Sequence, residues 1–232
     1  GFIPWNAHPT LQMTAGLQSQ LLEPHIGKVL RTDWLNSVWR HAEFIRGHMS
    51  RHSSANNHLI GELSGLFVAG ATWPFWEDAK QWRRIAREGL EREALVQNAP
   101  DGVNLEQATS YQQFVWDFLL FAGLAARATG KPMSEAYWER MEAMLEYVAA
   151  IMDAGGNVPM FGDADDGRVS GLSLGAAGCP FQSQLATGAL LFESPALARK
   201  AGIVDLRTRW LLGHEACAAF DSLLLQRVPA TA

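Results

Sequence analysis

Hydrophobic residues recur every three to four positions through most of the chain, which is the spacing of an amphipathic helix. No segment alternates apolar and polar residues in the strict way that a half-buried strand does. The pattern therefore predicts an all-α fold. The expected helices cover approximately residues 28–52, 57–71, 75–97, 105–129, 134–154, 184–201 and 205–227.

The segment 75–97 illustrates the pattern. Trp82, Ile85 and Leu90 fall on one side of a helix, while Arg83 and Arg87 fall on the other. Such helices, joined by short turns, can build a bundle, a solenoid or an α/α toroid. No fixed-period repeat is present, which argues against a tandem helical array.

The amino-acid composition changes in residues 155–183, which contain seven glycines, Pro159, Pro180 and the acidic run 162–167 (GDADDG). This composition predicts a long irregular loop, and long loops in compact domains are often functional. The acidic run does not fit a calcium-binding EF-hand. If Asp163 were the first ligand, Arg168 would stand where that loop needs glycine and Leu174 where it needs glutamate.

Composition narrows the class of protein. The 232 residues, 48% of them hydrophobic, suffice for one sizeable domain over residues 1–232. A net charge of −5 argues against a general nucleic-acid binder. No apolar run reaches the roughly 18 residues of a membrane span. Cys179 and Cys217 form no disulfide framework or zinc pattern, so we expect both to be buried or incidental.

The segment 40–52 is rich in basic groups, and its His48 and His52 have the spacing of a helical metal-binding pair. A third ligand is not apparent, so a solvated basic face is favoured and no metal or other cofactor is expected.

Candidate chemistry begins at residues 56–63 (NNHLIGEL). Asn56 and Asn57 precede or begin a helix, where amide groups can cap backbone N–H groups or bind an anion. His58 and Glu62 are four residues apart and so share one helical face. Taken alone, this segment leaves two interpretations open: one asparagine caps the helix and His58 is incidental, or the group is functional.

Tyr111 follows a polar run near the start of the predicted helix 105–129. It can be a core tyrosine with a bonded hydroxyl, or it can transfer protons. A free phenol has a pKa of about 10, so it is a poor base at neutral pH unless a nearby cation assists it. An imidazolium at His58 is one such cation.

Three motifs in this order resemble the heparinase II/III-like polysaccharide lyases: 56–63 (NNHLIGEL), 106–114 (EQATSYQQF) and 161–167 (FGDADDG). The resemblance covers about residues 30–200. It implies an incomplete α/α toroid, with a β-sandwich domain elsewhere in the full-length protein. It also implies a periplasmic or secreted location, although the N-terminus of this chain has no signal-peptide layout.

The resemblance further implies β-elimination in an acidic polysaccharide. Asn57 and His58 would neutralise the carboxylate of a uronic acid. Tyr111 would remove the C5 proton, protonate the leaving glycosidic oxygen, or do both. The expected substrate contacts are Asn56, Glu62, Gln107 and Asp163.

Two alternatives remain. The toroid can be a glycan-binding module without catalysis, or a glycoside hydrolase that uses Asp163 or Asp165 with Glu62. The identity of the glycan, a glycosaminoglycan or alginate among others, is open.

Overall fold

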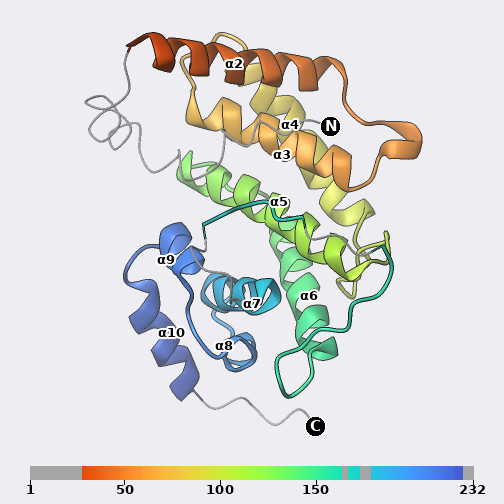
Figure 1. The fold of residues 1–232 in the computed structure, drawn as a ribbon, viewed down its shortest axis with the longest axis vertical. Helices are drawn as coiled ribbons and strands as arrows, with labels where there is room; N and C mark the ends of the chain where they lie inside the picture. Colours follow the sequence, from red (N-terminus) through yellow and green to blue (C-terminus); the bar gives the residue numbers. More distant parts are fainter. Residues whose placement is uncertain (1–27, 164–166, 173–178, 227–232) are drawn as a thin grey trace. The chain divides into compact units, whose positions relative to one another are not determined.

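A computed structural model describes residues 28–163, 167–172 and 179–226 of the chain. In these ranges the regular secondary structure is helical, with no β-strand (Figure 1). The chain divides into two compact units. The first contains the described residues up to Gln97 together with Phe118–Tyr137, and the second contains Asn98–Asp117 and the described residues from Trp138 onward.

The first unit is built around α3 (Asn57–Thr72), which packs against α2 (Lys28–Gly47) and α4 (Ala79–Val96). Most of α3 is buried because apolar or small side chains occupy all of its faces. Leu63, Leu66 and Phe67 are among its fully buried residues. Small residues bring the helices close together: a Cβ atom added to Gly89 of α4 would lie 2.7 Å from Leu63 Cδ1.

Several polar side chains in the interior of the first unit are hydrogen-bonded. Trp82 Nε1 donates to Glu43 Oε1 over 2.7 Å. Arg46 donates two hydrogen bonds to Glu43 of the same helix, each 2.9 Å long. The hydrogen bonds from Arg46 hold the pKa of Glu43 below its ordinary value. Tyr137 Oη donates to the carbonyl of Leu119 over 2.7 Å, and burial raises the pKa of this tyrosine well above its ordinary value.

α5 (Thr109–Ala128) and α6 (Glu135–Ile151) each run from one unit into the other. The second unit also contains α7 (Pro180–Leu191), α8 (Pro195–Ala201), α9 (Leu206–Leu212) and α10 (Ala216–Leu225). α7 contacts the three helices that follow it. Its Gly188 lies directly against Leu145 of α6, where a larger residue would not fit.

The predicted helices 184–201 and 205–227 are wrong as single helices. The first is interrupted after Leu191, and α8 begins at Pro195 with Ser194 as its N-cap. Proline has no N–H group and disfavours helical geometry in the preceding residue, so one helix ends and another begins there. The second is interrupted at Gly213, whose φ of 92° lies outside the helical region.

Other boundaries differ less. The predicted helix 28–52 ends at Gly47, and the predicted helix 75–97 begins only at Ala79. α7 starts at Pro180, so residues 180–183 are helical and do not belong to the predicted loop. Between α6 and α7 the described residues are not helical. Asp165, a candidate hydrolase carboxylate, and Leu174 lie outside the described residues.

Replacing Gly89 with valine tests the close packing of α3 on α4. We expect the free energy of unfolding to fall by about 1–3 kcal/mol, because the added side chain collides with Leu63. Urea denaturation measures the change. The control is Gly47→Ala at the exposed end of α2, where an added Cβ meets nothing within 4 Å. Equal losses in both variants would contradict close packing at Gly89.

Candidate active site

Tyr111 lies in the first turn of α5 and is half-buried. Its hydroxyl donates a hydrogen bond to Asp163 Oδ2 over 3.2 Å. The second and third motifs of the sequence, 52 residues apart at these two positions, therefore meet within the second unit.

Backbone and hydroxyl groups hold these two segments together. Thr109 N donates to the carbonyl of Phe161, and Phe161 N donates to Thr109 Oγ1, each over 3.1 Å. Thr109 Oγ1 also donates to the carbonyl of Pro159 over 2.8 Å. Ser110 Oγ donates to the carbonyl of Asp163 over 2.9 Å. The position of the loop on α5 thus rests on four contacts that do not involve the Asp163 carboxylate.

A glycine is required at position 162, where the loop passes close to the backbone of Gln107 and Ala108. Its φ is 75°, and a Cβ atom added to it would lie 2.5 Å from the carbonyl oxygen of Gln107. Gln107 itself has a φ of 54°, which is uncommon for a residue other than glycine. The Gln107 side chain is exposed, and its contact with substrate stays a prediction.

Gln112, on the next turn of α5, anchors the segment that leads into the helix. Its Oε1 accepts from the backbone N–H of Asn104 over 2.8 Å, and its Nε2 donates to the carbonyl of Gly102 over 2.9 Å. The start of α5 is therefore held by the segment before it as well as by the loop.

The first motif lies in the first unit. Asn56 is the N-cap of α3, and its Oδ1 accepts from His58 N over 3.1 Å. The interpretation that one asparagine caps this helix is confirmed for Asn56. Asn57 begins the helix and is buried, while His58 is exposed. The imidazole is accordingly open to solvent, and the catalytic roles of Asn57 and His58 stay predictions.

Glu62 is 3% exposed. Its Oε2 accepts from Ser50 N over 2.6 Å, and its Oε1 accepts from Ser50 Oγ over 2.7 Å. These bonds fix the segment that leads into α3. Glu62 therefore has a structural role, and substrate binding by Glu62 stays a prediction.

His48 and His52 do not lie on one helix. The helical metal-binding spacing that their sequence positions suggested is therefore absent. α2 ends at Gly47, and His52 has a φ of 59° in a short 3-10 turn. The His48 ring stacks on Phe44, with 4.3 Å between ring centroids. In the described part of the chain, no three His, Cys, Asp or Glu side chains gather into a metal site.

A cavity of about 630 Å³ adjoins this end of α5 in the second unit. Its lining mixes hydrogen-bonding groups, apolar surface and one guanidinium, and includes Ser110, Gln113, Asn157, Met160, Arg168 and Phe181. Three hydrogen bonds hold Asn157 to the carboxylate of Asp153, and those from its side chain are the main reason that the pKa of Asp153 lies below its ordinary value. Such a lining suits a polar ligand with an acidic group.

Cys179 also lines this cavity. Cys179 and Cys217 are both free thiols and half-buried, so of the two expected states, buried or incidental, full burial is not observed.

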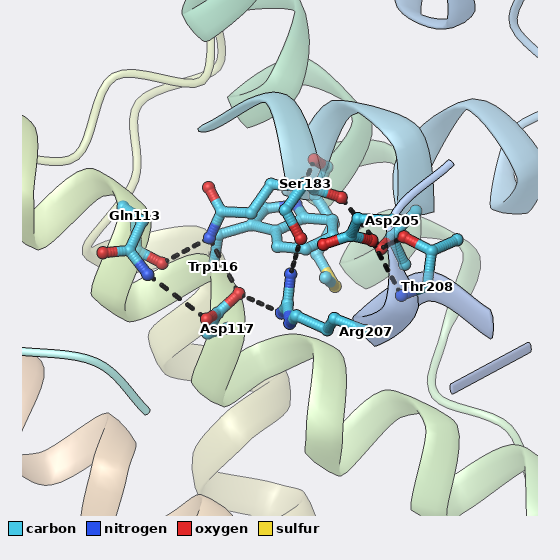
Figure 2. Close-up of polar contacts among 10 residues, drawn as sticks. Gln113, Trp116, Asp117, Ser183, Asp205, Arg207 and Thr208 are labelled. Carbon is cyan, nitrogen blue, oxygen red and sulfur yellow. Dashed lines mark hydrogen bonds and ion pairs between the residues drawn. The ribbon is translucent and has the colours of Figure 1, made fainter. Parts of the chain in front are cut away.

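A buried ion pair joins α5 to α9 (Figure 2). Arg207 Nη2 lies 2.5 Å from Asp117 Oδ1, and the two side chains are 6% and 5% exposed. Gln184 Nε2 donates to the same oxygen over 2.8 Å, and Gln113 Nε2 donates to Oδ2 over 3.2 Å. Gln113 belongs to both the cavity wall and this network, so the network fixes part of the wall.

Asp205 extends the same region. It caps α9 by accepting from Thr208 N over 2.9 Å. Burial alone would raise the pKa of Asp205. Hydrogen bonds from Ser183 and Thr208 and the charge of Arg207 outweigh burial, so the pKa lies below its ordinary value. The ionised carboxylate is therefore the form that the fold stabilises.

The all-α architecture and the motifs joined at α5 agree with the comparison to known proteins. The sequence profile of the family described as "Heparinase II/III N-terminus" matches residues 11–173. The chain belongs to this family.

A heparin-sulfate lyase from Bacteroides stercoris is 27% identical over 153 residues, which cover 65% of this chain and 22% of that protein. The solved structure of heparinase III, the BT4657 gene product, is 27% identical and has a TM-score of 0.50. The match covers 64% of this chain and 23% of the other. A second structure, with methylated lysines, has a TM-score of 0.49. This chain thus spans less than a quarter of each relative's length.

The predicted fold class, all-α with the helical hairpins of an incomplete α/α toroid, is confirmed. Within the described ranges, no helix has the length and apolar character that a membrane crossing requires. Sequence reasoning missed Thr109 and Ser110 as the residues that hold the loop. Their hydroxyls directly precede Tyr111, and this was the available signal.

The buried ion pair predicts that replacing Asp117 destabilises the fold much more than replacing an exposed acidic residue. Asp117→Ala leaves the Arg207 charge buried without its carboxylate, and we expect a loss of about 3–5 kcal/mol in the free energy of unfolding. Glu88→Ala removes an exposed ion pair with Arg84 and should cost no more than about 1 kcal/mol. Chemical denaturation of both variants measures these losses. Similar values for the two would exclude a stabilising network around Asp117.

The lowered pKa of Asp205 predicts a dependence of stability on pH. Its stabilisation is complete above the unfolded pKa of about 4 and is lost as the pH falls through the lower folded value. Asp205→Asn should therefore be less stable than the wild type at pH 6, and the difference should shrink towards pH 3. Urea denaturation across this range measures it. Asp221→Asn, at an exposed position on α10, is the control; if it showed the same trend, the effect would not be specific to Asp205.

Proposed function

We propose that the full-length protein is a polysaccharide lyase that cleaves a uronic-acid-containing glycan by β-elimination. The observation that carries the proposal is the phenol of Tyr111, presented at the start of α5 and hydrogen-bonded to the acidic loop. Membership of the heparinase II/III family supports it. The name of the Bacteroides relative, a heparin-sulfate lyase, supports a glycosaminoglycan as the first substrate to test.

The reaction needs proton transfer at two atoms. The C5 proton leaves to a base, and the electron pair of the C5–H bond forms the C4–C5 double bond. The C4–O bond breaks, and the glycosidic oxygen takes that electron pair and a proton. Tyr111 is a group of the right type for one or both transfers. No water attacks, so no hydrolytic nucleophile is required.

The carbanion at C5 forms only if the uronate carboxylate is neutralised. We assign this role to Asn57 and His58, whose amide and imidazole can donate hydrogen bonds to the carboxylate as charge develops. The exposure of His58 is compatible with contact to a polymer.

The cavity beside Ser110 supports an acidic substrate as well, because Arg168 brings a positive charge to its wall, and the other described residues of the lining are neutral. The wider proposal includes a β-sandwich domain in the full-length protein and a periplasmic or secreted location.

The full-length protein should produce an unsaturated uronate from heparan sulfate or another uronic-acid polymer, with a rise in ultraviolet absorbance. Tyr111→Phe should lower kcat by about 100- to 10,000-fold, because the phenyl ring cannot transfer a proton. His58→Ala should lower kcat by about 100-fold or more, because a donor to the developing charge is lost. Steady-state kinetics on the same polymer measures both effects.

The matched controls are Tyr147→Phe on α6 and the exposed His214→Ala, which should keep wild-type turnover. Full activity in both Tyr111→Phe and His58→Ala would overturn the assigned roles. Binding without product would instead indicate a glycan-binding module, and saturated products would indicate a hydrolase.

A further inference from the structure

The exposed guanidinium of Arg168 lines the cavity of the second unit. It makes no hydrogen bond or ion pair with the described residues. We propose that Arg168 forms an anion subsite, which binds a sulfate or carboxylate group on a sugar next to the cleaved linkage. This inference rests on the proposed lyase function and names the residue that distinguishes an anionic from a neutral sugar at this position.

The carboxylates closest to Arg168 are already bound by other groups. A smaller recess of about 40 Å³ adjoins Arg168, and Asp117 and Asp205 also line it. Asp117 is held by Arg207 and by two glutamine side chains (Figure 2). Asp205 accepts from Thr208 N over 2.9 Å, and the charge of Arg207 acts on it as well. The charge of Arg168 is therefore left for a ligand.

The rest of the cavity lining suits a sugar ring. Asn157 Nδ2 donates to both carboxylate oxygens of Asp153, over 3.2 and 3.0 Å. The amide oxygen of Asn157 is therefore the atom left to accept a hydrogen bond from a ligand hydroxyl. Met160, which is 55% exposed, and Phe181 offer apolar surface to the C–H groups of a sugar. Together with the guanidinium, these groups match a sugar that carries an acidic substituent.

The subsite lies beside the proposed reacting group. Ser110 lines the cavity and directly precedes Tyr111 in α5. Its Oγ donates to the carbonyl of Asp163, and the carboxylate of Asp163 accepts from Tyr111. One sugar of a polymer can therefore occupy the cavity while the next sugar reaches Tyr111. Because Arg168 does not contact the reacting atoms in this arrangement, its removal should raise KM more than it lowers kcat.

The test measures binding separately from turnover. The full-length protein with Tyr111→Phe, which should hold a substrate without cleaving it, is titrated with a heparan sulfate oligosaccharide in a calorimeter. Adding Arg168→Gln should weaken binding by about 10-fold, because charge-assisted hydrogen bonds to the anion are lost. Arg168→Lys keeps the charge but not the planar set of donors, so it should weaken binding less than Arg168→Gln does.

Arg209→Gln is the matched control, because it removes an exposed arginine of α9 that belongs to the same unit and does not line the cavity. It should leave the affinity unchanged. An equal loss in Arg209→Gln and Arg168→Gln would indicate general attraction to an acidic polymer and would overturn the subsite. Thermal unfolding of Arg168→Gln should match that of the wild type, since the guanidinium has no partner among the described residues.

A second probe, the same oligosaccharide backbone without sulfate groups, identifies the anion. If Arg168→Gln weakens binding of the sulfated probe alone, the group that Arg168 binds is a sulfate. Equal losses on both probes assign a carboxylate, since both backbones carry uronic acid. No loss on either probe would overturn the inference, and so would a parent protein that binds neither of them.

Steady-state kinetics with Tyr111 intact separates this inference from the proposed function. Arg168→Gln should raise KM by about 10-fold and change kcat by less than about threefold. Binding that depends on Arg168 without any unsaturated product would leave the subsite in place and sink the lyase function. Unsaturated product formed with the same KM in Arg168→Gln as in the wild type would overturn the subsite and keep the lyase function.

Discussion

The first backbone N–H groups of α5 need hydrogen-bond partners from outside the helix, and this requirement organises the second unit. A helix leaves its first four N–H groups without internal acceptors. The segment between α6 and α7 supplies the carbonyl of Phe161 to Thr109, and the hydroxyls of Thr109 and Ser110 bind this segment in return. The same contacts bring the Asp163 carboxylate to Tyr111. The hydrogen bonds that cap the start of α5 therefore also position the candidate catalytic tyrosine and its partner.

The buried pair of Asp117 and Arg207 supports this arrangement two turns further along α5. A carboxylate at that depth requires a cation and further donors, because desolvation disfavours its charge. Arg207 and Gln184 meet this requirement from α9 and α7. Gln113, bonded to Asp117, faces the cavity as well. The cavity wall therefore depends on residues 67–90 positions away in the chain.

Hydrophobic periodicity was sufficient to predict that the chain is helical, because each helix has a buried face. It was not sufficient at residues 184–201 and 205–227, where apolar residues continue on both sides of Ser194 and Gly213 although the helix is interrupted there. The proline after Ser194 and the glycine at 213 were the local signals of these breaks. The three motifs indicated a candidate site, and two of them meet at the start of α5. The ion pair could not be predicted, since nothing near Asp117 or Arg207 in the sequence indicates the other.

In the first motif, the sequence alone does not distinguish residues with a structural role from residues with a proposed catalytic role. Asn56 caps α3 and Glu62 is bonded to Ser50, so two of its polar residues already have structural roles. These roles are compatible with the proposed catalytic function, because they fix the turn that carries Asn57 and His58. A hydrogen-bond donor can stabilise a developing charge only if its position is set beforehand. The rigid residues of the motif are therefore what would make its exposed histidine useful.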